Sequence, residues 1–553
     1  MISEVTEPCE PVNDDIILIT QFYISSSHLR QQEIIECLNF NLKNPLISKI
    51  IIITEREYTE PELQLADANY KTKLIQINVK ERMKYSHAFS IVDRYNFKGY
   101  IIIANSDIFF DNTLQNLYTS GLSSKKMIYS LLRFEYTDPD LNKCNLYSDS
   151  NGPYNYAQDT WIYHSNFNIN KSQQLVTKFE LGKLGCDNHI NYIFAILGYK
   201  IYNEPYYIKT YHNHKSNFRT YTSNITDRVP SPYVWITPAV PQTHPYCVNR
   251  TQNDWKYNIY EENNQLFYYI QYKISNNINF ILPRLQCGSE TMICSTAIPI
   301  LENKNLITKV EMVRLQKMCR ILKNNAGIQL SNIPSILKYA TMYLNAFAGS
   351  DTYFEWDPTG RLQFLKEHQE FINQKCNNKT KFWGYTLDVF HNIYNNPWTR
   401  ALKGKRLLII SPFINSMKEK LNILPQIYGV DLFPECSFIF IKPPQTHASN
   451  PANEFDIELD NFMNQIKKIK QHFDIALCSC GGYGNLVCYE IYKLNKSAIY
   501  IGGVLQMYFG IYGKRWLQER PDILRLFINK HWTRPSKEET PDGYQNIEGG
   551  CYW

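Results

Sequence analysis

The sequence predicts an α/β protein with two Rossmann-like domains, and three observations support this prediction. Isoleucine-rich segments of strand length alternate with helical patterns over the first 245 residues. A proline-rich segment, 229–246, interrupts this alternation, which restarts near residue 278. At 553 residues the chain is also too long to fold around one hydrophobic core. Continuous apolar strands separated by helices are typical of a parallel sheet that is covered on both faces.

The first domain is expected to span 1–245. Its apolar runs, such as IIIIT and GYIIIA, are short and rich in β-branched residues, so they indicate strands. Strand–helix–strand connections of this kind form right-handed βαβ units. We expect strands at 15–20, 50–54, 73–79 and 99–104, and helices at 29–42 and 85–95.

The second domain is expected to span 276–553, after a linker at 246–275. The segment 229–246 contains five prolines, and each proline fixes its own φ and restricts the residue before it, which predicts ordered coil. Beyond the linker we expect strands at 278–283, 405–411, 437–441, 474–479 and 497–501, and helices at 309–323 and 333–347.

The composition is typical of a folded, soluble protein. The chain is 44% hydrophobic and 20% charged, with a net charge of +6, and no dense run of Lys and Arg indicates nucleic-acid binding. No apolar stretch is long enough to span a bilayer, and the acidic amino-terminal segment does not resemble a signal peptide. The 14 cysteines lack the spacing of a zinc site. We therefore expect a cytoplasmic protein; the sequence leaves its oligomeric state open.

The segment IIIANSDIFFD, 101–111, carries the clearest functional signal. An apolar strand runs directly into the polar triplet Asn105, Ser106 and Asp107. In open α/β sheets, ligands bind outside the carboxyl ends of strands, where this triplet must lie. A carboxylate there can ligate a hard divalent cation, which keeps positions open for substrate phosphates. The triplet taken alone also fits an ordinary turn.

This run is similar to the metal-binding element of GT-A glycosyltransferases. Asn105 stands where that family usually has its first acid, which leaves Asp107 as the expected main metal ligand. The resemblance implies a GT-A domain that binds Mn²⁺ or Mg²⁺ and moves a hexosyl or pentosyl group from a nucleotide-sugar donor to a glycan acceptor. It also implies that His212, after a strand-like segment, is a second metal ligand, and that Ser106 contacts the donor.

Other segments agree with this resemblance in chain order. Thr20 and Gln21 end the first strand, where the family begins to hold the nucleotide, and Arg82 or Lys84 would contact the diphosphate. Within QDTW, the resemblance implies that Asp159 hydrogen-bonds to a sugar and that Trp161 stacks on it.

The resemblance also implies a general base. Asp187 opens a helical segment in the position of the family's base-bearing residue, so it would accept the proton of the acceptor hydroxyl during direct displacement at the anomeric carbon. Taken separately, Asp187 also fits a helix N-cap, and His212 fits a satisfied or surface histidine.

Two segments of the second domain could bind phosphate. Gly481 and Gly484 lie in a glycine-rich turn between a strand and a helix, which suits either phosphate binding or close helix–strand packing. Lys514 and Arg515 follow another strand and could bind a diphosphate or be solvated surface cations.

The second half contains the segments NNAGI (324–328), LKGKRLLIISPF (402–413), FDIALCSCGGYG (473–484), GGVLQMYFGIYGKRW (502–516) and EGGCYW (548–553). On these segments it resembles a family found beside polysaccharide genes and, more distantly, the GT-D type of glycosyltransferase. The GT-D type carries an Arg, a Gly and an acid in a short element, which RLQCGSE, 284–290, could represent, with Glu290 as the catalytic acid. The resemblance implies a bifunctional enzyme with a GT-A and a GT-D-like domain. The alternatives are one active GT-A domain joined to a glycan-binding or scaffolding domain, or to a sugar-modifying, methyltransferase-like domain.

Overall fold

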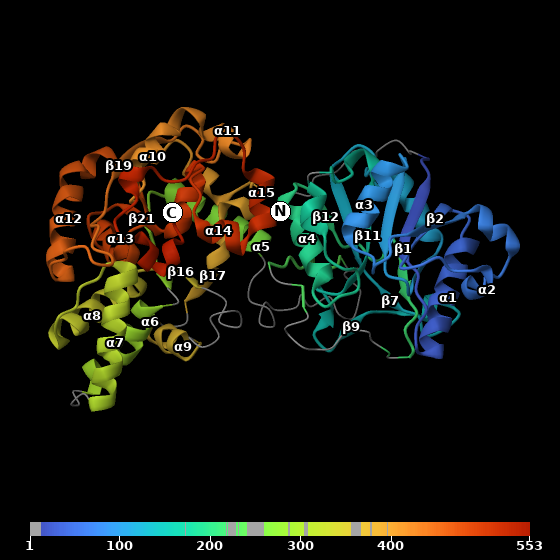
Figure 1. Cartoon of the computed structure of the whole chain (residues 1–553), viewed down its shortest axis with the longest axis horizontal. Helices are drawn as coiled ribbons and strands as arrows, with labels where there is room; N and C mark the ends of the chain where they lie inside the picture. Colours follow the sequence, from blue (N-terminus) through green and yellow to red (C-terminus); the bar gives the residue numbers. More distant parts are fainter. Residues whose placement is uncertain are drawn as a thin grey trace. The chain divides into compact units, whose positions relative to one another are not determined.

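The computed structural model describes residues 13–171, 173–216, 218, 228–229, 232–239, 259–285, 288–303, 308–355, 366–376, 379–394 and 396–553. The chain divides into two compact units, unit 1 (Met1–Asn258) and unit 2 (Ile259–Trp553) (Figure 1). Both units contain parallel strands with helices around them, which confirms the predicted α/β class. Among the described residues, no helix combines the length and apolar character needed to cross a membrane.

A seven-stranded mixed sheet forms the centre of unit 1, in the order β12-β6-β11-β4-β1-β2-β3. The first four strands along the chain are parallel to one another, as predicted. The sequence analysis did not anticipate β11, which lies antiparallel between β4 and β6. The strands are β1 (Ile16–Gln21), β2 (Ile47–Thr54), β3 (Leu74–Asn78), β4 (Tyr100–Ala104), β6 (Met127–Leu132), β11 (Gln158–His164) and β12 (Lys200–Tyr202).

Helices cover both faces of this sheet. Because successive strand residues point to opposite faces, the even-numbered residues of β1, β2 and β4 form one hydrophobic cluster with α1 (His28–Lys43). The opposite face contacts α3 (Tyr85–Arg94) and α4 (Cys186–Ile196), where Phe89 meets both Tyr163 and Phe194. This two-sided burial explains why the strands read as continuous apolar runs.

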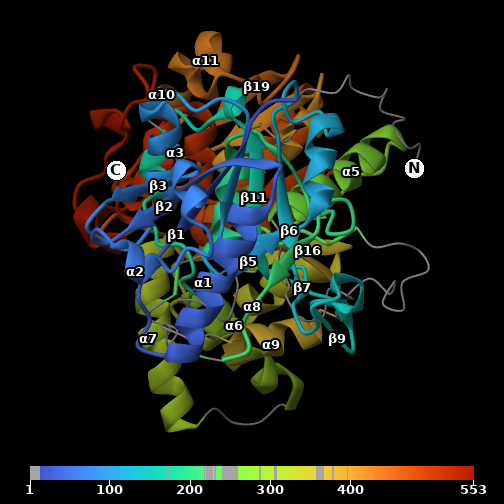
Figure 2. The ribbon, with the colours of Figure 1, turned by 90° about the vertical axis from the view of Figure 1, so that its right-hand side faces the viewer.

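A small second sheet, in the order β5-β13-β7-β8, positions the polar residues that follow β4. Its strands are β5 (Ile108–Phe110), β7 (Phe134–Glu135), β8 (Asn145–Leu146) and β13 (Thr210–His212), and the pair β9 (Ser148–Asp149) and β10 (Gly152–Pro153) lies apart from them in the topology. Helix α1 runs beside β5 (Figure 2), and the Asn41 side-chain amide donates to the Ile108 carbonyl at 2.8 Å. A short helix, α2 (Glu60–Leu63), completes the described α-helices of unit 1.

Unit 2 contains a five-stranded, fully parallel sheet in the order β14-β21-β20-β18-β19. The chain passes from β18 outward to β19 and then returns to β20 on the other side of β18. This reversal makes the carboxyl ends of β18 and β20 the expected ligand crevice of the sheet. The strands are β14 (Ile281–Leu282), β18 (Arg406–Ile410), β19 (Ser437–Ile441), β20 (Ile475–Cys478) and β21 (Ser497–Tyr500).

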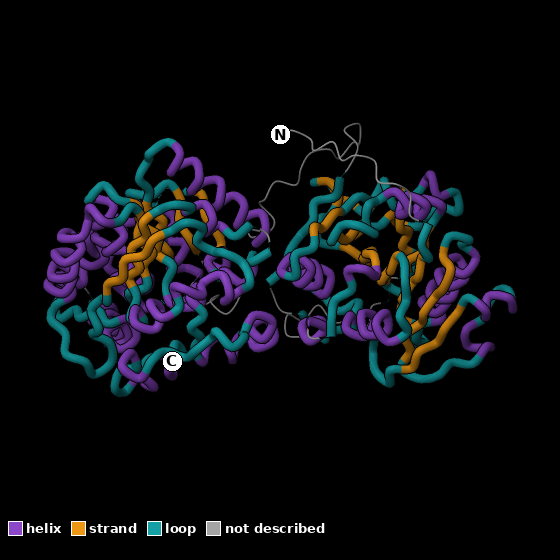
Figure 3. Tube along the Cα trace, turned by 90° about the horizontal axis from the view of Figure 1, so that it is seen from above, coloured by secondary structure: helices purple, strands orange, loops and turns teal. Residues whose placement is uncertain are grey.

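Helices surround this sheet, as the purple and orange tubes of Figure 3 show, and α6 to α9 gather at one end of the unit in Figures 1 and 2. A three-stranded sheet joins β15 (Arg284–Leu285), β16 (Thr352–Glu355) and β17 (Thr380–Trp383). The helices are α5 (Ile259–Ser275), α6 (Ser289–Asn303), α7 (Lys309–Ala326), α8 (Ile333–Ala348), α9 (Lys366–Lys375), α10 (Ile414–Glu419), α11 (Leu424–Tyr428), α12 (Phe455–Ile469), α13 (Gly484–Lys493), α14 (Lys514–Glu519) and α15 (Pro521–Phe527).

The structure differs from the predicted linker in its second part. Residues 259–275 form α5, which belongs to unit 2, whereas 246–258 lies outside the described residues. Leu266 and Ile270, four residues apart, are both fully buried, so the helix has an apolar face that packs within unit 2. Unit 2 therefore begins at Ile259, within the range predicted as linker.

Candidate active site in unit 1

A pocket of about 340 Å³ lies in unit 1 where β1 and β4 end. Carboxyl ends of neighbouring parallel strands meet at one edge of a sheet, and the pocket follows that rule. The structure brings eight of the predicted residues together there: Gln21, Arg82, Asn105, Ser106, Asp107, Asp159, Asp187 and His212.

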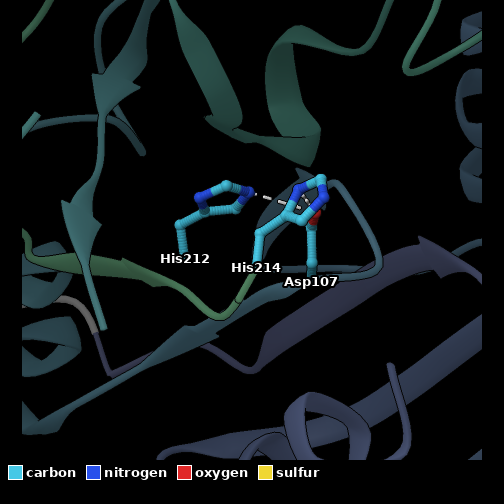
Figure 4. A group of neighbouring side chains, drawn as sticks. All are labelled: Asp107, His212 and His214. Atoms are coloured by element: carbon cyan, nitrogen blue, oxygen red, sulfur yellow. Dashed lines mark hydrogen bonds and ion pairs between the residues drawn. The ribbon is translucent and has the colours of Figure 1, made fainter. Parts of the chain in front are cut away.

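One wall of the pocket holds a cluster of three metal-ligand side chains, Asp107, His212 and His214 (Figure 4). One ligand atom from each lies within 4.8 Å of the others. The His212 Nε2 atom is 3.1 Å, and the His214 Nδ1 atom 3.7 Å, from Oδ2 of Asp107. A carboxylate and two imidazoles converging in a buried site fit a divalent cation. Because Mg²⁺ prefers oxygen ligands alone, the two imidazoles favour a transition-metal dication over Mg²⁺.

Backbone pairing explains how residues a hundred positions apart meet here. Strand β13 lies antiparallel to β5, with His212 opposite Ile108. The Asn213 amide donates to the Asp107 carbonyl at 2.9 Å, which fixes the two segments directly behind the cluster. His214 was missed by the sequence analysis, although two histidines spaced i, i+2 in an extended segment point to the same side.

The cluster is strongly ionic. Burial alone would raise the pKa of Asp107, but His212 and Arg30 hold it well below its usual range. Burial would lower the pKa of His212, but the Asp107 carboxylate raises it to about 9. Glu135 accepts a hydrogen bond from the other ring nitrogen of His212 at 3.1 Å, which orients the imidazole as a second-layer partner of a metal ligand does.

Asn105 connects the metal-ligand cluster to a neighbouring carboxylate. Its side-chain amide donates to Asp159 Oδ1 at 2.6 Å, and Arg133 donates to Asp159 Oδ2 at 2.5 Å. Asn105 therefore positions Asp159, a role that an aspartate could not perform because it would repel the second carboxylate.

Asp187 lies on the pocket wall in the first turn of α4. Burial and the nearby Asp159 carboxylate raise its pKa to about 7. Gly185 precedes the helix with φ at 80°, a conformation that glycine adopts at little cost, and it turns the chain so that Asp187 reaches the pocket. A carboxylate with a pKa near 7 can accept a proton at neutral pH.

Two predicted residues have structural roles instead. Thr20 is buried, is not among the pocket-lining residues, and donates from its hydroxyl to the Ala104 carbonyl at 2.9 Å, joining β1 to β4. Trp161 is fully buried on the face of β11 that α3 and α4 cover. Its indole donates to Asn191 at 3.2 Å and packs edge-on against Tyr85, so the prediction that it stacks on a sugar is wrong.

The sequence analysis also missed two arginines that line the pocket, Arg30 and Arg133. Arg30 shares a helix face with Ile34 and Leu38, four and eight residues later, and both of these are buried. Arg30 could therefore have been recognised from the sequence as an arginine on the apolar face of a helix. Arg133 gives no comparable signal, because its partners Asp159 and Glu135 are set by the fold.

The glycine-rich turn of unit 2 serves packing. A Cβ on Gly484 would lie 2.1 Å from the Tyr500 ring, and one on Gly481 would lie 2.8 Å from the Ala326 carbonyl oxygen. Gly484 therefore allows close contact between α13 and β21, and Gly481 allows close contact between the turn and the end of α7. Packing was the structural alternative of the sequence analysis, and a role of these glycines in phosphate binding is not supported.

Gly484→Ala is expected to destabilise unit 2 by about 1–3 kcal/mol, because the added methyl group overpacks the Tyr500 contact. Urea unfolding of the full chain measures this loss. Gly404→Ala is a comparison variant for backbone strain alone: a Cβ there meets nothing within 4 Å, and its φ of 73° costs about 1–2 kcal/mol. Equal stability of Gly484→Ala and the parent would contradict the packing role.

Lys514 and Arg515 differ: Arg515 is held by partners within unit 2, whereas the Lys514 side chain is exposed, as the solvated-cation alternative expects. Arg515 forms an ion pair with Glu548 at 2.5 Å and donates to the Tyr552 hydroxyl at 2.9 Å. The Lys514 ammonium donates to the Gly549 carbonyl at 3.4 Å. The Arg515 guanidinium is thus engaged by Glu548 and Tyr552, which the sequence analysis did not place.

Glu290 lies near the carboxyl edge of the unit 2 sheet, in the first turn of α6, which follows β14 and β15 in the chain. It is 8% exposed, and burial together with Glu548 raises its pKa to about 7, against the opposing effect of Arg284. Arg284 donates to the Ile501 carbonyl at 2.5 Å, beyond the end of β21. Residues 286–287 of the RLQCGSE element lie outside the described residues.

Neither a family model nor a curated protein sequence matches the chain. Three solved structures show partial similarity. GalNAc-T7 with UDP, GalNAc and Mn²⁺ is 10% identical over 38% of this chain and 46% of its own, with a TM-score of 0.29, so this chain spans less than half of that protein. Mannosyltransferase PcManGT from Pyrobaculum calidifontis with GDP-Man and Mn²⁺ is 11% identical over 67% and 88%, with a TM-score of 0.24. A putative glucose-1-phosphate thymidylyltransferase from Bacillus anthracis with sucrose is 12% identical over 34% and 86%, with a TM-score of 0.23.

Proposed function

We propose that unit 1 is a glycosyltransferase that moves a sugar from a nucleotide-sugar donor to a hydroxyl group of a glycan acceptor. The observation that carries this proposal is the convergence in one pocket of a metal-ligand cluster and a separate carboxylate, Asp187, whose pKa is near 7. Diphosphate departure and hydroxyl activation need these two kinds of group.

The donor diphosphate is assigned to the side of the pocket that holds Asp107, His212 and His214. These three residues would hold Mn²⁺, which when bound neutralises charge on the departing diphosphate. Arg82 lines the same pocket, where its guanidinium donates to the Gly182 carbonyl at 3.2 Å and lies 3.9 Å from Glu180 Oε2, and we assign it to the diphosphate.

The acceptor is assigned to the side that holds Asp187 and Asp159. Asp187 takes the proton of the acceptor hydroxyl as that oxygen forms a bond to the anomeric carbon and the bond from this carbon to the diphosphate breaks. Asp159, held by Asn105 and Arg133, offers a fixed acceptor for a sugar hydroxyl. Direct displacement inverts the configuration of the anomeric carbon.

Unit 2 is proposed as a second transferase, with Glu290 as its acid. A buried carboxyl whose pKa is about 7, close to Arg284 and beyond the end of a parallel strand, supports this proposal. The alternative of a glycan-binding or scaffolding domain needs no such group. A methyltransferase-like domain is disfavoured, because Tyr500 and Ala326 occupy the space against the glycine-rich turn where a cofactor would bind.

A panel of nucleotide-sugars tests the proposal. With the full chain and no acceptor, we expect slow release of nucleoside diphosphate from one or a few donors, faster with Mn²⁺ than with Mg²⁺ because two ligands are imidazoles. Chromatographic detection of the nucleotide measures it. Release from no donor under either metal would contradict the proposed function.

A further inference from the structure

Arg30 contacts the carboxylate of the metal-ligand cluster. Its Nη2 atom lies 2.6 Å from Oδ2 of Asp107, the same oxygen that both His212 and His214 approach. Both charged groups of this ion pair are almost completely buried, with side-chain exposures of 9% and 7%. The guanidinium and the two imidazoles therefore share one carboxylate oxygen, Oδ2 of Asp107.

A second carboxylate holds the other end of the same guanidinium. The Arg30 Nη1 atom donates to Glu33 Oε2 at 3.1 Å, and Glu33 also accepts from the Ser216 backbone amide at 2.6 Å and from its hydroxyl at 2.9 Å. Glu33 is thus fixed by the segment that follows His214. Arg30 keeps this partner if it releases Asp107.

A bound dication and the guanidinium cannot share Oδ2 of Asp107 at low cost. Arginine stays protonated in proteins, so its charge cannot be removed when a metal ion approaches. A charge of +2 ligated by this oxygen would stand a few ångströms from a charge of +1, inside a buried site where screening by water is weak.

We infer that Arg30 is an internal cation that competes with the divalent ion for Asp107, so that metal binding requires the guanidinium to leave this carboxylate. The inference rests on the proposed metal centre. Once released from Asp107, Arg30 stays anchored to Glu33 at the pocket wall and turns its free N–H groups toward the donor diphosphate. Metal and donor binding are thereby coupled through one side chain.

Mn²⁺ binding to the full chain without nucleotide tests this inference, with free Mn²⁺ measured by electron paramagnetic resonance. Arg30→Gln is expected to bind Mn²⁺ at least about tenfold more tightly than the parent, and Arg30→Lys, which keeps the charge, to stay close to it. Arg56→Gln is the matched control, because it removes an equal charge from an exposed pair with Glu62 and should leave the affinity unchanged. Unchanged or weaker binding by folded Arg30→Gln would overturn the inference.

A second variant guards against misfolding of Arg30→Gln. Glu33→Gln removes the anchor to which the guanidinium retreats, so it should weaken Mn²⁺ binding about threefold or more; tighter or unchanged binding would overturn the inference.

His214→Ala separates this inference from the proposed metal centre. If the parent binds Mn²⁺, His214→Ala does not, and Arg30→Gln binds as tightly as the parent, only the role of Arg30 is rejected. Binding by none of these proteins rejects the metal centre as well.

Discussion

Replacing Asp107 by alanine should lower the metal-dependent release of nucleoside diphosphate by about 10³-fold or more. Asp107 is the one carboxylate of the metal-ligand cluster, and both histidines lie against its Oδ2 atom. Loss of this ligand removes several kcal/mol of charge stabilisation from the departing diphosphate, and each 1.36 kcal/mol is about a tenfold change in rate. Initial rates with the best donor and saturating Mn²⁺ measure the effect.

Two controls accompany this variant. Asp107→Ala leaves the buried Arg30 without one of its partners, so thermal unfolding must show that the protein is folded, and Asp107→Asn provides a variant of the same size. Asp67→Ala, an exposed helix cap far along the chain from the site, should keep full activity. Parent-like release by folded Asp107→Ala would remove Asp107 from the metal centre. Transfer that survives in this variant but disappears when Glu290→Gln is added would assign a reaction to unit 2.

Replacing Asp187 by asparagine should lower the transfer rate by about 10²–10⁴-fold, the range that one general base contributes. The pKa of Asp187 is raised to about 7 by burial and by Asp159, so the carboxyl is protonated below that pH and cannot accept a proton. In the parent protein, kcat/KM for transfer should therefore rise about tenfold per pH unit below pH 7 and become constant above it. Rates from pH 5 to 9 with a fixed donor and acceptor measure this profile.

The properties that Asp187→Asn preserves distinguish a general base from a residue with a purely structural role. Asp187→Asn keeps the size of the side chain, so Mn²⁺ affinity and donor KM should stay within about threefold of the parent while the limb near pH 7 disappears. Asp67→Asn should keep both the rate and the profile. A variant that loses little activity, or that keeps the limb, would show that Asp187 is only a residue of the first turn of α4 and takes no proton.

The periodicity of the sequence predicts the main layers of both units. The expected helix 29–42 corresponds to α1 (His28–Lys43), and the expected strand 99–104 corresponds to β4 (Tyr100–Ala104). These elements are predictable because two-sided burial makes strands continuously apolar and spaces apolar helix residues by three and four. Strands β5 and β13, with three residues each, are too short to show a period, so the small sheet was not predicted.

Some residues of the candidate site could likewise be predicted from the sequence, and others could not. Residues at strand ends, such as Asp107, were predictable because a polar triplet after an apolar strand marks the ligand edge of a sheet. The partners that tune them were not, because Arg30 is 77 residues away from Asp107 and Arg133 is 26 residues away from Asp159. Trp161 was misassigned because β11 had not been predicted as a strand. Successive side chains of a strand point to opposite faces of the sheet, and this decides that Trp161 enters the core.

The pairing of β14 with β21 has a consequence for how unit 2 is made. In its five-stranded sheet, β14 has only β21 as a neighbour, and the hydrogen bond from Phe280 to Ser497 spans 217 residues. A contact of such long sequence separation forms late, since the intervening chain must first lose much of its conformational freedom. During synthesis on the ribosome, the sheet of unit 1 can form before β21, the partner of β14, has been synthesised. After β14 has been synthesised and before β21 follows, the nascent chain exposes the unpaired apolar edge of a strand. Chaperones cover surfaces of this kind.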